Sequence, residues 1–458
     1  MDFSSANTGL WSAMLQLGII AATILAANVM RRKLPFVRKT LIPTSVLAGF
    51  VLLGVRNLNL LYIDTMFLEM ITYHGIAIGF IALSLRVPDL DTEGGSDRLI
   101  APKSGALIIS TYLIQGIMGL IITLGLAYTI RPEVFKAAGI LLPMGFGQGP
   151  GQANNVGGMY EALGFIGGRS FGLSIAASGF VSACIIGVVY LNFLVRKGEV
   201  KVQGYEEVAE SLSPDKFQDK NEIPIAESID RFSMQIALVF IVYLITFLVL
   251  QGLTTLIAAV APGLSSTVEP LFWGFNFIVG SLMAILLRGF FKGLQKTKMM
   301  TRQYQNNYLL SRISGLAFDV MIVAGIASID IVDLSGLWLP FILLSIAGGF
   351  GTFYWLKWIC KRIYPDYFYE GMLSMYGMLT GTISSGVLLL REIDPEFETP
   401  AAQNLLTGSS FAILMGAPML LLIGLAPISP LMTFVTLGLL VVYLVPLLLF
   451  LLKAKARK

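Results

Sequence analysis

Eleven apolar runs, most of them close to 20 residues long, constrain the fold of this chain more than any other feature of its sequence. A membrane-spanning helix needs about 20 consecutive apolar residues. Only 13% of the 458 residues are charged, whereas soluble domains carry about 25%. These features predict an all-α polytopic membrane protein with about 11 transmembrane helices. We expect the spans at residues 10–30, 41–57, 64–86, 104–130, 171–195, 233–256, 271–287, 307–327, 336–356, 404–424 and 431–452.

Two polar stretches interrupt the apolar pattern, one in each half of the chain. Residues 144–155 combine glycines with four amide side chains, and residues 376–386 combine glycines with four serine and threonine hydroxyls. Irregular backbone at membrane depth is tolerated only where protein covers it or where it lines a wet cavity. A matched pair of such breaks, one per half, points to the binding site of a transporter. We therefore expect two re-entrant hairpins, near 134–160 and near 365–390.

The distribution of basic residues favours this topology. With both hairpins re-entrant, 27 of the 32 Lys and Arg residues fall in cytoplasmic loops, as the preference of positive loops for the cytoplasm requires. A first stretch that crossed the membrane fully would instead move the basic residues of 196–232 and 288–302 outside. No Lys or Arg precedes the first apolar run, and Arg31, Arg32 and Lys33 follow it. We expect the N-terminus outside and the C-terminus in the cytoplasm.

The same topology predicts two repeats of opposite orientation, each with five spans and one hairpin. Gly145 and Gly377, like Gly149 and Gly381, are separated by 232 positions. Inverted repeats of this kind are one plan of secondary transporters. The expected organisation is a first repeat over 1–197, a charged cytoplasmic linker over 198–232, a second repeat over 233–427, and an extra C-terminal helix with a basic tail over 428–458.

The hairpin tips carry the residues that we expect to bind a substrate. Glycines let the backbone approach a ligand closely, and the N-terminal end of a half-helix attracts carboxylates. The alternative is helix packing through small residues, as in other membrane interfaces. The candidate substrate-binding residues are Gly147, Gln148, Gly149, Gly151, Gln152, Asn154, Asn155, Thr380, Gly381, Thr382, Ser384 and Ser385.

Asp319 is an acidic residue inside the apolar run 307–327. An acid at the centre of a membrane helix costs about 2.5–3.5 kcal/mol on insertion scales, so it is a functional candidate by default. We expect a sodium site formed by Asp319, Asn154 and Ser385. The alternative is a structural ion pair with Arg312, although seven residues exceed the usual helical pairing distance. His74 and Gln115, polar residues within other spans, are more typical of interhelical hydrogen bonds than of ligands.

Signatures of enzymes are weak in this sequence. A single histidine excludes a histidine-based metal cluster, and the glycine-rich stretch lacks the Lys-Ser/Thr ending of a nucleotide-binding loop. Cys184 and Cys360 lack metal-ligand spacing. We expect a protein that is not an enzyme, needs no organic cofactor and binds no nucleic acid. The formal charge of +4 reflects membrane topology instead.

With these features in view, the chain resembles the bacterial sodium/glutamate symporter family. Residues 147–153, Gly-Gln-Gly-Pro-Gly-Gln-Ala, are similar to a family Gly-His-Gly-Thr-Gly-Ala-Ala segment, and residues 41–49 are similar to an Ile-Pro-Glu-Pro-Val-Ala-Gly-Gly segment. The resemblance covers most of residues 10–424. It implies Na⁺-coupled uptake of an amino-acid dicarboxylate, and a homodimer in the bacterial inner membrane. It also implies a transport domain that carries both hairpins and slides against a dimerising scaffold.

The chain departs from the family pattern at the tips. Gln148 stands where the family has histidine, Pro150 where it has threonine, and residues 383–385 where it has Thr-Pro-Thr. The expected function is a secondary active transporter that couples sodium to the uptake of glutamate or a related small anion by an elevator motion. Alternatives are a transporter of the same fold for another solute or coupled to protons, an ion channel, and a membrane enzyme.

Overall fold

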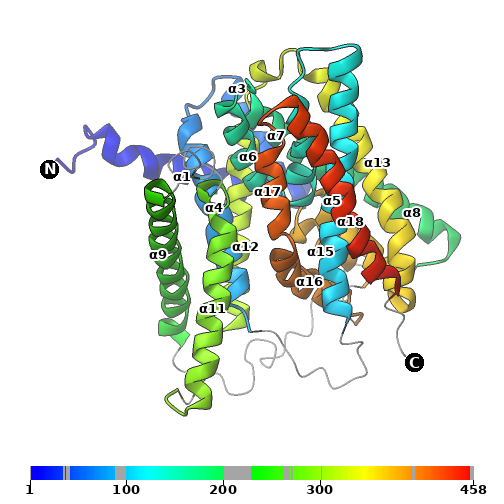
Figure 1. Cartoon of the computed structure of the whole chain (residues 1–458). Coiled ribbons are helices and arrows are strands. Elements are labelled where there is room, and N and C mark those ends of the chain that lie inside the picture. Colours follow the sequence, from blue (N-terminus) through cyan, green and yellow to red (C-terminus); the bar gives the residue numbers. More distant parts are fainter. Residues whose placement is uncertain are drawn as a thin grey trace.

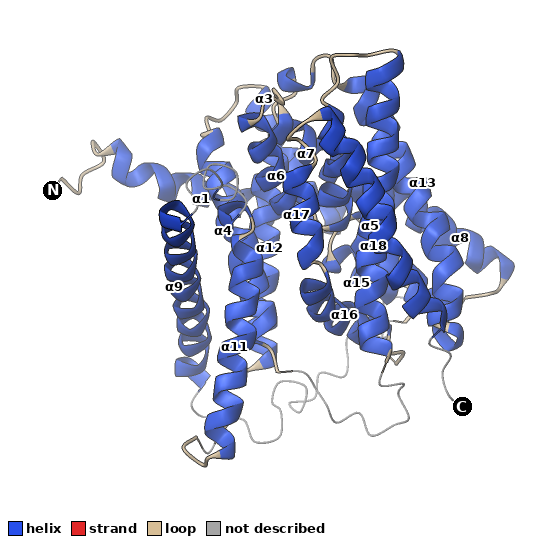
Figure 2. Cartoon of the chain, in the orientation of Figure 1, coloured by secondary structure: helices blue, strands red, loops and turns tan. Residues whose placement is uncertain are grey.

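The fold is known from a computed structural model in which every regular element is helical within the described ranges (Figure 2). The described residues are 2–34, 37, 42–87, 99–200, 228–260, 269, 272–300, 302–394 and 398–453. The all-α prediction is thereby confirmed for this part of the chain.

The described first half of the chain forms four long helical spans, two short α-helices, α3 (Thr44–Asn57) and α6 (Pro150–Ala162), and irregular helical turns. Its elements are α1 (Thr8–Lys33), α3 (Thr44–Asn57), α4 (Thr65–Leu85), α5 (Ile100–Thr129), η1 (Lys136–Ile140), η2 (Pro143–Gly147), α6 (Pro150–Ala162), α7 (Gly168–Ser182), η3 (Ala183–Gly187) and α8 (Val188–Lys197). Because η3 is a single π-helical turn, α7, η3 and α8 form one apolar span from Gly168 to Lys197.

The second half contains a comparable set of helices in a similar order. Its elements are α9 (Ser228–Val260), α11 (Asn276–Lys296), α12 (Asn307–Ala327), η6 (Val332–Leu334), α13 (Trp338–Ile363), η7 (Pro365–Tyr367), α14 (Phe368–Thr380), α15 (Ile383–Arg391), α16 (Ala401–Met415), α17 (Ala417–Leu425) and α18 (Pro430–Lys453).

Local sequence explains several helix boundaries. The side chains of Asn7, Asp64 and Asn306 accept hydrogen bonds from backbone N–H groups in the first turns of α1, α4 and α12. These caps satisfy donors that a helix leaves free at its start. Gly198 adopts the left-handed conformation that commonly ends a helix and thereby terminates α8.

Nine helices in the described part of the chain are long and apolar enough to cross a membrane. The bent pair α16 and α17 makes up to ten, and α3 is a shorter apolar helix. The protein is therefore a membrane protein with several helices able to span the bilayer. The eleven predicted spans correspond to these elements. Nine of them are long and apolar enough as single helices to cross a membrane, and the other two correspond to α3 and to the bent pair α16 and α17.

The structure differs from several of the predictions about span and linker bounds; for example, the span expected at 336–356 continues to Ile363. The span expected at 271–287 begins at Asn276 and continues to Lys296. The span expected at 404–424 is bent by 56° between α16 and α17. Pro418, two residues after Gly416, cannot donate a backbone hydrogen bond at this bend. The linker expected over 198–232 ends earlier, because α9 already begins at Ser228. Residues 201–227 of that linker lie outside the described residues.

The helices pack as two bundles (Figure 1). In the first bundle, α4 packs against α11 and α12, α3 packs against α1 and α12, and α9 packs against α11. In the second bundle, α5 packs against α13, α16, α18 and η1, while α7 packs against α6 and α13. The bundles meet mainly where α6 contacts α4 and α12.

Two arginines of the first bundle each donate hydrogen bonds to carbonyls at the C-terminal end of another helix in that bundle. Arg56 of α3 donates to the carbonyl of Ala327 at the end of α12, at 2.8 Å. Arg288 of α11 donates to the carbonyl of Arg86, the residue that ends α4, at 2.7 Å. Cations at a helix C-terminus satisfy free carbonyls and interact favourably with the helix dipole. Each half of the chain thus caps a helix of the other half.

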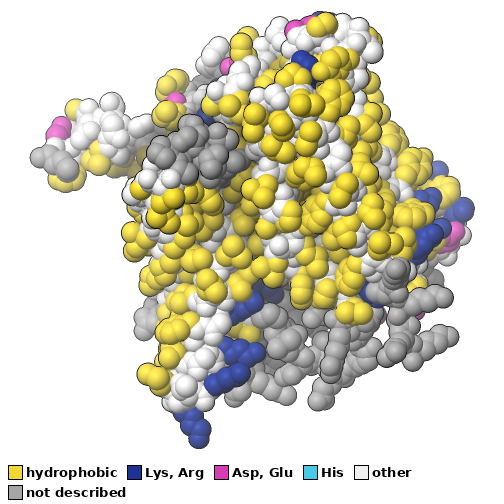
Figure 3. All heavy atoms as spheres, viewed as in Figure 1, with side chains coloured by type: hydrophobic (Ala, Val, Ile, Leu, Met, Phe, Trp, Pro, Cys, Tyr) yellow, Lys and Arg dark blue, Asp and Glu magenta, His cyan; other side chains and the backbone are white. Residues whose placement is uncertain are grey.

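The outer surface fits a lipid environment. Figure 3 shows hydrophobic side chains over most of the visible face, with Lys and Arg gathered toward the lower and right-hand edges. One basic edge belongs to the C-terminal end of α11, which carries Lys292 and Lys296. Such a band of apolar side chains between more polar ends is typical of a protein surrounded by lipid tails.

Candidate functional site

The first polar stretch forms a break between η2 and α6. Five consecutive residues of η2 are buried, and the chain then passes through Gln148 and Gly149 into α6. Gly149 has φ +85° and ψ −172°, a backbone region essentially confined to glycine. The ring of Phe135, before this segment, contacts the rings of Tyr160 and Phe165 after it. The two ends of the segment therefore lie together, and Gly149 lies at the break between them.

The second polar stretch forms a break between α14 and α15. The two helices lie side by side and antiparallel, because a methyl group on Gly377 would lie 2.8 Å from Cα of Gly386. A methyl group on Gly386 would lie 2.5 Å from the carbonyl oxygen of Ser374. The chain turns through Gly381 and Thr382. Small residues thus let this pair of helices approach closely around the break.

The two breaks meet each other inside the protein. A methyl group on Gly149 would lie 3.5 Å from the carbonyl oxygen of Gly381 and 3.5 Å from Cγ2 of Thr382. Gln115 of α5 supports both breaks. Its Nε2 donates to the carbonyl of Leu379 at 2.9 Å, and its Oε1 lies 3.0 Å from the position of a methyl group on Gly147. The expectation that Gln115 makes interhelical hydrogen bonds agrees with this geometry.

A cavity of about 100 Å³ lies beside these breaks, between the two bundles. Its polar lining includes Gln148 and Thr382, with Gly147 and Gly381 next to them. The first bundle contributes Ile76, Phe80, Phe277, Ile278, Phe318 and Met321 to the same cavity. Four of the residues predicted from sequence to bind a substrate therefore share one cavity.

Several buried polar atoms around the breaks have no hydrogen-bond partner within the described part of the protein. The Gln152 side chain is fully buried, and neither its Oε1 nor its Nε2 is bonded. The Oγ of Ser385, which is 3% exposed, is likewise without a partner and lies 2.7 Å from the position of a methyl group on Gly381. Thr382 Oγ1 and Asn154 Oδ1 are also unbonded. Buried polar groups are normally hydrogen-bonded, so these atoms are available to a ligand.

Other predicted residues have structural partners. Asn155 donates through Nδ2 to the carbonyl of Gly274 at 2.8 Å, which links α6 to the first bundle. Thr380 donates to the carbonyl of Tyr376 at 2.7 Å within its own helix. Gly151 lies against Ile76. The side chain of Ser384 lies outside the described part of the structure.

Asp319 does not line the cavity. Its carboxyl is half-buried and lies near the hydroxyl of Ser45 on α3, which has no hydrogen-bond partner within the described structure. Phe318 and Met321 occupy the face of α12 that reaches the cavity. The alternative of an ion pair with Arg312 is not what the structure shows, because that guanidinium lies over the Tyr308 ring at 4.9 Å. The sodium site proposed for Asp319, Asn154 and Ser385 stays a prediction, and only the latter two lie in the helices that flank the breaks.

Several residues that line the cavity were not predicted from the sequence. Tyr112, Met378 and Ser409 line it together with Phe80 and Phe318. Apart from Met378, which lies within the second polar stretch, these residues belong to predominantly apolar runs, where periodicity cannot separate a cavity-lining position from a lipid-facing one. His74, in contrast, pairs with another helix as expected, since its Nδ1 lies 2.6 Å from the Tyr243 hydroxyl.

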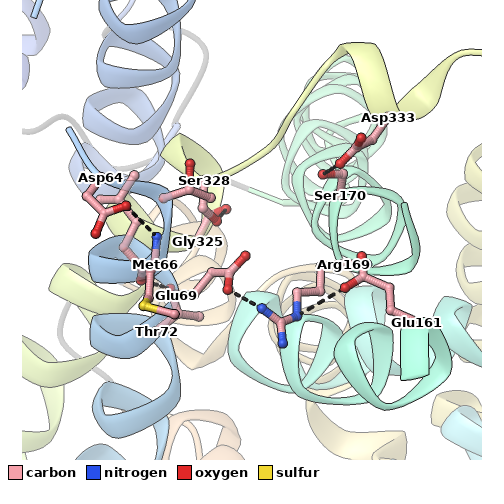
Figure 4. Close-up of polar contacts among 12 residues, drawn as sticks. Asp64, Met66, Glu69, Thr72, Glu161, Arg169, Ser170, Gly325, Ser328 and Asp333 are labelled. Atoms are coloured by element: carbon pink, nitrogen blue, oxygen red, sulfur yellow. Dashed lines mark hydrogen bonds and ion pairs between the residues drawn. The ribbon is translucent and has the colours of Figure 1, made fainter. Parts of the chain in front are cut away.

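An ionic cluster also connects the two bundles. Arg169 of α7 pairs with Glu69 of α4 and, at 3.4 Å, with Glu161 of α6. Figure 4 shows the guanidinium between the two carboxylates, with Ser170 and Asp333 nearby. Ser170 donates to the Asp333 carboxylate at 3.0 Å. Sequence spacing could not reveal this cluster, because Glu69 and Arg169 are 100 positions apart.

Comparisons with models of protein families, with curated proteins and with solved structures found no match to this chain.

Proposed function

We propose that this protein is a secondary active transporter for a small organic anion. The observation that carries the proposal is the meeting of two helix N-termini, those of α6 and α15, at a cavity between two bundles. Gly149 and Thr382 are the residues before these helices, and they lie against each other. Helix N-termini favour anions because they present free N–H groups and positive dipole ends.

The paired breaks support two re-entrant hairpins. Each polar stretch has a break at Gly149 or Gly381, and these two glycines are separated by the same 232 positions as Arg56 and Arg288. The two arginines perform the same capping role at the ends of α12 and α4. A shared offset and a shared role are what an inverted repeat produces, and transporter sites lie at the interface of such repeats.

The two bundles support an elevator motion. All elements that carry the polar breaks belong to the second bundle, while one wall of the cavity belongs to the first. A solute bound at the breaks would therefore move with the second bundle as it slides along the first. The first bundle would be the scaffold of a homodimer in a bacterial inner membrane, with the N-terminus outside and the C-terminus in the cytoplasm.

Sodium fits the site as a coupling ion. Neutral oxygens with no described partner flank the breaks, including Ser385 Oγ and Asn154 Oδ1. Groups of three or more His, Cys, Asp or Glu side chains that could hold a metal ion are not found among the described residues. Neutral oxygens suit a hard monovalent cation, as in other transporters with broken helices. The family resemblance adds sodium as the coupling ion and glutamate as one candidate solute.

The test is uptake into proteoliposomes. Purified protein would be reconstituted with an inward Na⁺ gradient or a matched choline gradient, and accumulation of radiolabelled L-glutamate and other small carboxylates would be measured. Na⁺-dependent accumulation of at least one carboxylate is expected. If no carboxylate accumulates with Na⁺ or with a proton gradient, coupled anion uptake is excluded. Ion currents far above the turnover of a transporter would instead favour a channel.

A further inference from the structure

We infer that the transported solute is a monoanion with an apolar body, whose single charged group lies between the two breaks. This inference rests on the proposed function and names its substrate class. It differs from the dicarboxylate that the family resemblance implies. The polar lining, the apolar lining and the size of the cavity each contribute to it.

The polar side of the cavity, next to the N-termini of α6 and α15, has features that can bind one anionic group. In α6 the first intrahelical bond runs from Ala153 to the Gly149 carbonyl, and in α15 it runs from Gly386 to the Thr382 carbonyl. The N–H groups that precede Ala153 and Gly386 in these helices have no acceptor within the helix. The unbonded hydroxyl of Thr382, the residue before α15, lines the cavity, and the unbonded side chains of Gln152 and Ser385 lie behind that lining in the first turns of α6 and α15. The two helix ends thus converge on one region with donors and positive dipole ends.

A second negative charge would have no charged partner among the described residues that line this cavity. Gln148 is the only amide among its lining residues, and no Lys, Arg, Asp or Glu side chain lines it within the described structure. Transfer of an ionised carboxylate from water into an unpaired apolar site is strongly unfavourable. Away from the breaks, the described lining offers a second carboxylate only the neutral hydroxyls of Tyr112 and Ser409, and the Ser409 hydroxyl already donates to the Leu405 carbonyl at 2.6 Å. A dicarboxylate would therefore place its second charge among mostly hydrophobic side chains, whereas a monoanion would not.

The remaining wall is apolar and partly aromatic. Phe80 packs edge-on against Phe318, with ring centroids 5.4 Å apart, and tilted against Phe277 at 5.0 Å. Met378 and Met419 extend the wall on the side of the second bundle. Methionine adapts to irregular apolar shapes, so this wall suits a compact branched or aromatic group better than a polar one.

The size of the cavity sets the size of the solute. A water-sized group needs about 10–15 Å³ in this measure of volume, so a cavity of about 100 Å³ holds roughly six to ten non-hydrogen atoms. A branched carboxylate such as 4-methylpentanoate falls in this range. Its carboxylate would face the helix N-termini and its isobutyl group would face Phe80 and Phe318.

The experiment compares three probes with the full-length protein purified in detergent with Na⁺. The probes are 4-methylpentanoate, its neutral amide 4-methylpentanamide, and glutarate, a dianion of similar size. Thermal unfolding would be followed at rising probe concentration, because a ligand that binds the native state raises the midpoint. We expect 4-methylpentanoate to raise the midpoint, with an affinity at least ten-fold higher than that of either other probe.

Two variants test whether the apolar group of 4-methylpentanoate binds against Phe80. Phe80→Ala is expected to weaken binding of 4-methylpentanoate about ten-fold, because it removes the aromatic wall. Phe290→Ala is the matched control, since Phe290 is 59% exposed on α11 and does not line the cavity. Equal effects of the two variants on the affinity for 4-methylpentanoate would show that its apolar group does not bind against Phe80, and would overturn this part of the inference.

The outcomes separate this inference from the proposed function. If 4-methylpentanoate has no effect, or if glutarate or L-glutamate binds as tightly, the inference is wrong. Na⁺-dependent uptake of glutarate or L-glutamate into proteoliposomes would then still support the proposed function. Absence of both carboxylate binding and carboxylate uptake would overturn the two together.

Discussion

At the scale of single residues, Gly149 controls the geometry of the first break. Its backbone conformation, φ +85° and ψ −172°, is accessible essentially only to glycine. The same residue touches Gly381 and Thr382 of the second break. Strain at this position would therefore displace the N-terminal turn of α6 relative to that of α15.

We predict that Gly149→Ala lowers the free energy of unfolding by about 1–3 kcal/mol and abolishes carboxylate-dependent thermal stabilisation. Thermal unfolding with and without a carboxylate measures both effects. Gly125→Ala is the control, because Gly125 is exposed on α5 and has no atom near the position of a methyl group. Wild-type stabilisation in Gly149→Ala would show that the break does not position the binding groups.

Residue identity alone located part of the site. Gln148 and Thr382 were predicted because amides and hydroxyls beside glycines are unusual in apolar runs, and both line the cavity. The same reasoning predicts Asp319, yet Asp319 does not line the cavity. The difference lies in helix rotation, since adjacent residues of a helix point about 100° apart. Sequence shows that Asp319 is within a span but does not fix which neighbour it faces.

At the scale of helices, Arg56 and Arg288 make equivalent caps. Each guanidinium bonds to backbone carbonyls at the end of a helix from the other half of the chain. Removal of either would leave those carbonyls without their donor in an apolar environment. The two sites lie on different helices, so each can be tested independently of the other.

We predict that Arg56→Gln and Arg288→Gln each lower the free energy of unfolding by a similar amount, about 1–3 kcal/mol. Chemical or thermal unfolding of the purified variants gives these values. Arg312→Gln serves as the control, because Arg312 is exposed and stacks on Tyr308 without capping a helix. A large effect of one cap and none of the other would contradict the structural equivalence of the two halves.

At the scale of the whole molecule, ion pairs connect the two bundles. Arg169 pairs with Glu161 in its own bundle and with Glu69 in the other. Glu161 and Arg169 belong to the second bundle and Glu69 to the first. Sliding of the bundles would separate Arg169 from Glu69 while it kept Glu161. In the proposed elevator mechanism, the ion pair of Arg169 with Glu69 would then stabilise the arrangement of bundles seen in this structure relative to the arrangements in which the bundles have moved apart.

We predict that Glu69→Gln raises the rate of uptake at saturating solute about two- to five-fold, as expected for loss of a partly exposed ion pair that resists the motion. Initial uptake rates in proteoliposomes measure this change. Glu133→Gln removes the exposed pair with Arg131, which does not join the bundles, and should leave the rate unchanged. An identical rate in Glu69→Gln and wild type would show that the pair is not broken during transport.

The sequence by itself determined the helical class, the approximate positions of the spans and the two polar breaks. These follow from local properties, because a lipid environment demands long apolar helices and tolerates glycine-rich interruptions only where they are covered or line a cavity. Only the tertiary structure decided which residues meet. The contact between Gly149 and Gly381, the aromatic wall at Phe80 and the link from Glu69 to Arg169 all join distant segments. Such contacts depend on helix rotation and packing, which uniformly apolar sequence leaves open.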